Sequence, residues 1–188
     1  MHASLIGAAG VYFVAARLNA MGLQCAPTFG NVPNVDILAS SLNGSALVSL
    51  QVKTTTDGLR KRGRGDNRKP HHYEWDIGWK SARLRAPDLF FALVDLKEFA
   101  ELPDVFIVPS KVVADYFDPT CAASSGLWST RSRPDPWHRA RYHELVEELA
   151  RYKNDWAAIG NRLTELDRKA TPARADAKAG PSACASRS

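Results

Sequence analysis

Residues 33–54 read PNVDILASSLNGSALVSLQVKT, two runs rich in strand-forming residues on either side of an Asn43-Gly44 pair. Asn and Gly accept the positive φ angles that tight hairpin turns need, so the pattern predicts a β-hairpin. If the chain folds back at this pair, Asp36 on the first strand lies opposite the neighbourhood of Gln51 on the second. The segment therefore predicts two antiparallel strands with polar side chains gathered at one end.

The polar residues at that end have the chemistry of a metal site. Because side chains alternate along a strand, Gln51 and Lys53 point to one face and Val52 to the other. Mg²⁺ prefers oxygen ligands, and Mn²⁺ shares that preference. Asp36 would supply a carboxylate, while the Gln51 side chain and the Val52 carbonyl would supply neutral oxygens. Such an ion activates water and polarises phosphate, and Lys53 would stabilise developing negative charge. These residues predict a site for phosphodiester hydrolysis.

Asp36 followed by Gln51-x-Lys53 resembles the PD-(D/E)XK nuclease superfamily, in the Q-x-K variant of Mrr-type restriction nucleases. The resemblance covers roughly the first 110 residues in layout. It implies an α/β, restriction-endonuclease-like fold with an αβββαβ core and a mixed central sheet. It also implies Mg²⁺-dependent (or Mn²⁺-dependent) cleavage of DNA in restriction, repair or mobile-element defence. Asp36, Gln51 and Lys53 would be the active-site residues.

Two features depart from the superfamily pattern. No acidic residue precedes Asp36, whereas many relatives place a glutamate on the first helix. Gln51 replaces the usual second carboxylate, so we expect weaker Mg²⁺ binding. Glu74, or else Asp57, is the candidate for a compensating acid. The alternative hypothesis is a catalytically inactive nuclease fold that binds DNA or a partner protein.

Positive charge is concentrated in one segment. Between Arg60 and Lys69 there are six basic residues and one acidic residue, which matches the net charge of +5 for the whole chain. The composition of residues 56–70 predicts a mobile basic loop. Since it begins just after Lys53, we expect it to contact DNA phosphates, with a solvated insertion as the alternative. The candidate nucleic-acid-binding residues are Arg60, Lys61, Arg62, Arg64, Arg68, Lys69 and Lys80.

The remaining pattern predicts an ordinary α/β scaffold. We expect helices over residues 4–21, 79–86 and 111–117, and strands over 23–29, 71–78, 88–96 and 104–109. In the strand over 71–78, Tyr73 and Trp75 would face the core and His72, Glu74 and Asp76 would face outward. Stacking of these aromatic residues on bases is the alternative. Adjacent residues on a strand point oppositely, so His71 and His72 together make a poor zinc site.

The C-terminal third predicts a long amphipathic helix that starts at Asp135-Pro136. Its apolar seam would pack on the core; a homodimer or docking into a defence complex through this helix is the alternative. The expected organisation is a core over residues 1–120, a linker and helix over 121–168, and a disordered tail over 169–188. Three widely spaced cysteines favour a cytoplasmic setting. The twelve apolar residues from Leu5 to Ala16 are too few to cross a bilayer, so no membrane partner is expected.

Overall fold

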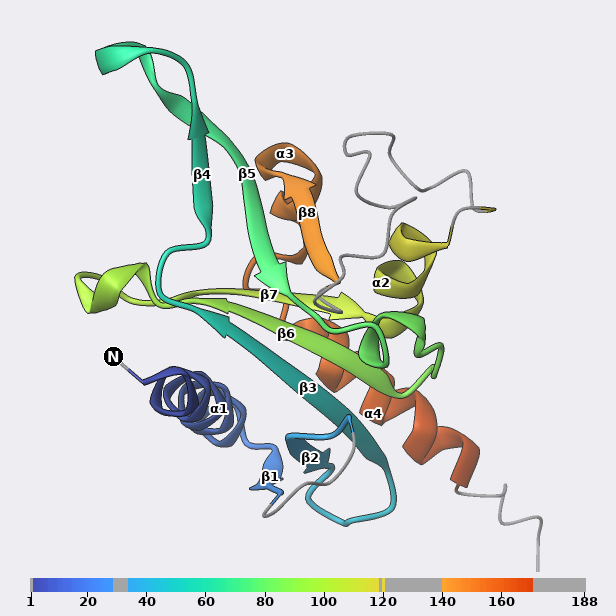
Figure 1. The fold of residues 1–188 in the computed structure, drawn as a ribbon. Coiled ribbons are helices and arrows are strands. Elements are labelled where there is room, and N and C mark those ends of the chain that lie inside the picture. Colours follow the sequence, from blue (N-terminus) through green and yellow to red (C-terminus); the bar gives the residue numbers. More distant parts are fainter. Residues whose placement is uncertain (1, 29–33, 119, 121–139, 171–188) are drawn as a thin grey trace, which may run out of the picture.

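A mixed five-stranded sheet forms the centre of the protein, with the strand order β1-β2-β3-β6-β7 (Figure 1). The computed structural model describes residues 2–28, 34–118, 120 and 140–170. The strands are β1 (Gln24–Pro27), β2 (Ile37–Ser40), β3 (Leu47–Thr55), β6 (Leu89–Asp95) and β7 (Asp104–Pro109). β3 and β6 run parallel, and the other neighbours run antiparallel. This confirms the predicted α/β class with a mixed central sheet.

The predicted hairpin joins β2 and β3. Gly44 has a φ of +70° in its turn, a conformation that glycine adopts without a steric penalty. Ile37 pairs with Leu50, and the Asp36 N–H donates to the Leu50 carbonyl at 2.9 Å. Asp36 therefore lies opposite Gln51, as the sequence predicted.

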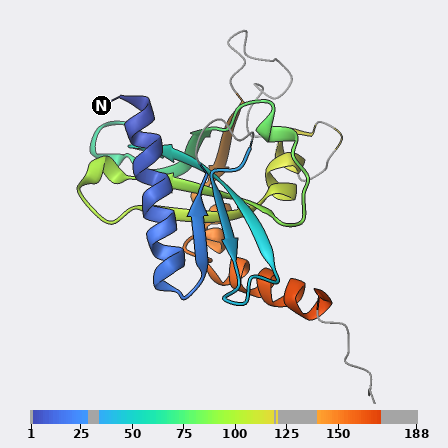
Figure 2. The ribbon, with the colours of Figure 1, turned by 90° about the horizontal axis from the view of Figure 1, so that it is seen from below.

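Helices α1 (Ala3–Ala20) and α4 (Ala157–Ala170) cover one face of this sheet. Figure 2, seen from below, shows α1 lying in front of the strands. By length and composition α1 is long and apolar enough to cross a membrane. Here it packs on the sheet through Gly10, Val14 and Leu18, while Leu5 and Tyr12 are 61% and 63% exposed. The helix thus packs on the core along one side, although its sequence is apolar almost all round.

Gly10 is the point of closest approach between α1 and the sheet. A Cβ at this position would overlap the hydroxyl oxygen of Thr54 on β3, whereas a Cβ at Gly7 would meet nothing within 4 Å. We expect Gly10→Ala to lower the free energy of unfolding by about 1–3 kcal/mol through overpacking. Gly7→Ala should instead raise it by up to about 1 kcal/mol, because alanine is the better helix former. Urea denaturation of both variants measures this, and equal stabilisation would contradict the close packing.

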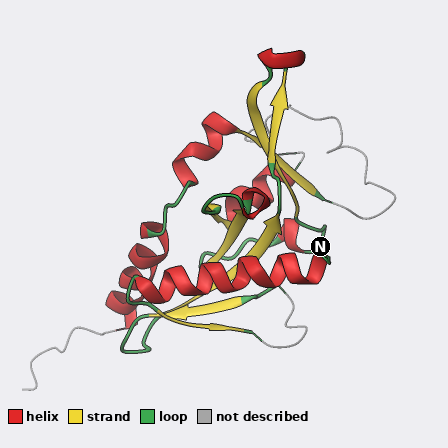
Figure 3. Cartoon of the chain, turned by 90° about the vertical axis from the view of Figure 1, so that its left-hand side faces the viewer, coloured by secondary structure: helices red, strands yellow, loops and turns green. Residues whose placement is uncertain are grey.

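A second, three-stranded sheet lies over the other face and projects from the molecule (Figures 1 and 3). It consists of β4 (Leu59–Arg62), β5 (Lys69–Asp76) and β8 (Arg141–Leu145), with the 3-10 turn η1 (Gly65–Asn67) at its tip. Residues 56–70, predicted as a mobile basic loop, therefore do not form a loop: most of the segment is an antiparallel hairpin. Backbone pairing forms this hairpin although nearly all of its side chains are polar. We name its projecting part, residues 59–71, the basic hairpin.

The buried strands were predicted correctly, and the short helix before them was not. β6 is buried along its whole length between β3 and β7. Helix α2 (Ser110–Phe117) follows β7 as expected. The helix predicted over residues 79–86 is only a 3-10 turn, η2 (Ser81–Arg83). The hydroxyl of Ser110 donates to the Ala86 carbonyl at 2.7 Å, and this contact ties the segment to the start of α2.

The long C-terminal helix does not form. Its predicted course contains β8, the short helix α3 (Val146–Leu149), the 3-10 turn η5 (Ala150–Tyr152) and α4, and its predicted start at Asp135-Pro136 lies outside the described residues, as do 171–188. A break occurs before α4, where Asn154 has a positive φ of 54°. Trp156, Ile159 and Leu163 are buried in the core, so the predicted packing of this seam is correct. This part of the apolar surface proposed for a dimer is therefore covered within the chain.

Candidate active site

The Asp36 carboxylate lies against the backbone of β3. The Val52 N–H donates to its Oδ2 at 2.7 Å, which places the carboxylate beside the peptide between Gln51 and Lys53. This contact arises because β2 begins only at Ile37, so the β3 backbone at Val52 has passed the end of its partner strand. The N–H and C=O of one strand residue point to the same side. The Val52 carbonyl is therefore directed to the same side as Asp36, as a metal ligand there would need.

Gln51 lies on the same face of the sheet as Asp36. Its side chain is buried, with 6% of the residue exposed. Its Oε1 has no hydrogen-bond partner among the described residues. A buried amide oxygen without a partner costs about 1–3 kcal/mol, so such an atom calls for a ligand that the described residues do not supply. A cation beside Asp36 meets that need.

Lys53 completes the group two residues further along β3. It is partly buried, and burial lowers the pKa of its ammonium, while the negative charge of Asp36 opposes part of this shift. The two side chains thus interact electrostatically, although the described residues contain no direct ion pair between them. Asp36, Gln51 and Lys53 are brought to one face of the sheet, as the alternation of β3 predicted.

The compensating acids lie elsewhere. Tyr73 and Trp75 face the central sheet, so Glu74 between them points to the outer face of the second sheet. There it pairs with Arg60 at 3.4 Å and with Arg141 at 2.9 Å. Asp57 pairs with Arg60 at 3.4 Å. The prediction of Glu74 as a ligand beside Asp36 is corrected, because strand alternation turns it away.

Sequence reasoning missed the contact between Ser81 and Asn34 beside this site. Ser81 in η2 donates to the side-chain oxygen of Asn34 at 3.3 Å, which brings the segment after β5 next to the approach to Asp36. Lys80, a predicted DNA contact, is exposed immediately before Ser81. No local signal links residues 34 and 81, since only the packing of the second sheet brings them together. Asp95 is a buried acid on the same face as Gln51. Its strand partner on β3 is Thr55, which lies about 13 Å beyond Gln51 at 3.3 Å per residue.

The predicted DNA-binding residues divide into two groups. Arg60 forms ion pairs with Glu74 and Asp57, so these acids largely neutralise its charge. The others are exposed and form no ion pair with another described residue; they are Lys61, Arg62, Arg64, Arg68, Lys69 and Lys80. Five of these six lie on the basic hairpin.

The burial of Lys53 has a consequence for stability. Since its pKa in the folded protein is below that of the unfolded chain, its charge destabilises the fold at pH 7. This penalty disappears above the ordinary lysine pKa of about 10.4, where the amine is neutral in both states. We expect Lys53→Met to raise the free energy of unfolding by about 1 kcal/mol at pH 7, with a smaller difference near pH 10. Urea denaturation at both pH values measures this, with exposed Lys61→Met as the control; a less stable Lys53→Met at pH 7 would contradict it.

Comparison with known proteins places the fold. No protein-family model matches the chain, and no curated protein is significantly similar to it in sequence. Among solved structures, the chain is similar to the bacterial homing endonuclease I-Ssp6803I, with a TM-score of 0.55 and 16% sequence identity. The match covers 89% of this chain and 98% of that one. At this identity the likeness concerns the architecture alone, and we conclude that the chain has a restriction-endonuclease-like fold.

Proposed function

We propose that this protein is a metal-dependent endonuclease that hydrolyses DNA phosphodiester bonds at Asp36, Gln51 and Lys53, in the Q-x-K arrangement. One observation supports this above the others. The buried Oε1 of Gln51 has no hydrogen-bond partner among the described residues, and it shares its face with the Asp36 carboxylate. A carboxylate, an amide oxygen and a nearby peptide carbonyl are the donors that Mg²⁺ or Mn²⁺ takes in proteins.

The donor set fits a hard divalent ion. Asp36 would supply the charged ligand, and Gln51 Oε1 and the Val52 carbonyl the neutral ones. When bound, such an ion lowers the pKa of a coordinated water and polarises a phosphate oxygen. With one carboxylate in the set, we expect weaker binding of Mg²⁺ than at a site with two.

Lys53 would act on the substrate. Its amine lies on the same face as Gln51 and close enough to Asp36 for the carboxylate to affect its pKa. In a partly buried position an ammonium group interacts strongly with a phosphate, because water screens it less. Lys53 would thus stabilise the negative charge that develops on the phosphate during hydrolysis.

The basic hairpin supports DNA as the substrate. On β6, Phe91 and Leu93 are the partners of Gln51 and Lys53, so all four side chains share one face of the central sheet. Phe91 and Leu93 pack in the same core cluster as Tyr73 of β5, so β5 covers that face. The hairpin and the site thus lie on one side of the sheet. A DNA backbone crossing the site on that side would meet exposed positive charges, which bind phosphates without regard to sequence.

The experiment is incubation of the protein with supercoiled plasmid. We expect nicked or linear DNA with Mg²⁺ or Mn²⁺ and none with EDTA. Intact plasmid at every concentration of either ion, from a protein that binds the same DNA, would contradict catalysis. The proposal extends to a cytoplasmic role in restriction, repair or mobile-element defence.

A catalytically inactive DNA-binding protein is the second candidate. Neither Glu74 nor Asp57 lies at the site to supply a second carboxylate. This candidate predicts salt-dependent binding of DNA with no cleavage, so the same plasmid experiment separates the two.

A further inference from the structure

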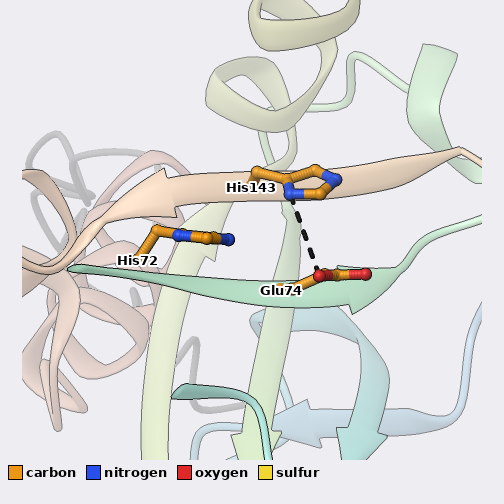
Figure 4. A group of neighbouring side chains, drawn as sticks. All are labelled: His72, Glu74 and His143. Atoms are coloured by element: carbon orange, nitrogen blue, oxygen red, sulfur yellow. Dashed lines mark ion pairs between the residues drawn. The ribbon is translucent and has the colours of Figure 1, made fainter. Parts of the chain in front are cut away.

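Three metal-binding side chains meet on the outer face of the second sheet (Figure 4). His72 and Glu74 come from β5, and His143 comes from β8. One ligand atom from each lies within 4.8 Å of the others. Neither histidine belongs to the PD-(D/E)XK resemblance or to the Asp36 site, and Glu74, the predicted compensating acid, is turned away from that site.

Strand pairing explains why these residues converge. Glu74 and His143 are direct cross-strand partners, so their side chains project from the same face. His72 lies two residues before Glu74 and therefore shares that face. The inward face of β5 is used by Tyr73 and Trp75, which leaves the outer face to polar residues. The sequence alone suggested the outward direction of His72 and Glu74, but not the approach of His143, which is distant in the chain.

The donor types indicate the class of ion. Two imidazoles and a carboxylate suit Zn²⁺ and related transition metals, whereas Mg²⁺ and Ca²⁺ prefer oxygen alone. Both histidines are partly or largely shielded from solvent, and burial lowers the pKa of each imidazole. Burial thus favours the neutral imidazole, which is the form that binds a metal.

We infer that His72, Glu74 and His143 form a binding site for a transition-metal dication such as Zn²⁺, separate from the proposed catalytic site. A metal ion there would link β5 to β8 at the foot of the basic hairpin. Among the described strands, β8 lies at the edge of the sheet and pairs with β5 alone. The site is therefore a structural one, which fixes the edge of the sheet that supports the hairpin.

Two arginines compete for the same carboxylate. Arg141 pairs with Glu74 at 2.9 Å and Arg60 at 3.4 Å, so binding of the metal requires Glu74 to exchange at least one ion pair. Asp76, which also pairs with Arg141 at 3.4 Å, can receive that arginine when Glu74 is taken by the metal. We expect Arg141→Gln to bind zinc more tightly than the wild type, since it removes the stronger competitor. Weaker binding by this variant would contradict the exchange.

Titration of the untagged, EDTA-treated full chain with Zn²⁺, and with Co²⁺ as a spectroscopic probe, tests the inference. We expect one ion per chain and a visible Co²⁺ absorption band. Glu74→Gln, His72→Asn and His143→Asn should each weaken binding by at least about tenfold. His2→Asn, a change to an exposed histidine immediately before α1, should leave it unchanged. Circular dichroism of each variant shows whether the fold is kept.

Two outcomes would overturn the inference. One is a wild-type protein that binds no Zn²⁺ at micromolar concentration. The other is equal affinity in folded Glu74→Gln and His143→Asn variants, which would mean that the ion binds elsewhere. Asp36→Asn should leave zinc binding intact, so failure of this site and failure of the proposed nuclease site can be told apart.

Discussion

Asp36→Asn should reduce metal-dependent DNA cleavage by on the order of 10²–10³-fold, the usual cost of losing one electrostatic contact in an active site. The asparagine oxygen can still accept the hydrogen bond from the Val52 N–H, so the hairpin should fold as before. What is lost is the only formal negative charge that the described residues of the site offer to a cation. The expected result is therefore a folded protein with normal DNA binding and almost no cleavage.

Initial rates of plasmid nicking, measured over a range of Mn²⁺ concentrations, give this value. Asp57→Asn is the matched control, since Asp57 is an exposed acid paired only with Arg60 among the described residues. It should cleave at the wild-type rate. Equal loss of activity in both variants, or full activity in Asp36→Asn, would remove Asp36 from the site.

Neutralising the tip of the basic hairpin should weaken DNA binding at every sequence. Arg62 and Arg64 are exposed and form no ion pair with another described residue. Each phosphate contact contributes about 0.9 to the slope of log affinity against log salt concentration. We therefore expect the double variant Arg62→Gln/Arg64→Gln to reduce that slope by about 2. The loss of affinity should be largest at low salt.

Binding isotherms at several salt concentrations measure the slope. Arg168→Gln/Lys169→Gln removes the same charge from α4, which packs against the opposite face of the central sheet. That control should leave the slope near the wild-type value. If both double variants change the slope equally, the binding reflects net charge and not the position of the hairpin.

The local signals that determine the hairpin were strong enough to predict it. Asn43-Gly44 fixes the turn, and the apolar residues of β3 alternate with polar ones, so a shift of one residue would bury the polar set. That register places Asp36 opposite Gln51. The unbroken apolar run of β6 likewise predicts a strand buried on both faces. Both predictions rest on burial, which dominates local structure.

The errors occur where tertiary contacts decide the structure. The basic hairpin has almost no apolar side chains, yet β5 is anchored through Tyr73 and Trp75, and β4 pairs with it through the backbone. At the C-terminal end, spacings of three and four residues suggested one helix. In the structure Tyr142 belongs to β8 and Leu149 to the short helix α3, and only the seam from Trp156 onward lies next to or on the longer helix α4. The sequence does not show that residues 141–145 pair with β5.

The direction of the Glu74 side chain also depends on tertiary contacts. From the sequence, Glu74 is available as a ligand for the Asp36 site. In the structure, strand alternation directs it to the outer face of the second sheet, next to His143. The sequence correctly placed Asp36 opposite Gln51, because both belong to one hairpin.

Crystals of the protein soaked in Mn²⁺ would locate a bound ion by its anomalous scattering. We expect a peak in contact with the Asp36 carboxylate and Gln51 Oε1, and its loss in crystals of Asp36→Asn. A peak elsewhere with none beside Gln51, from a protein that cleaves DNA in the same buffer, would contradict the assignment of the active site.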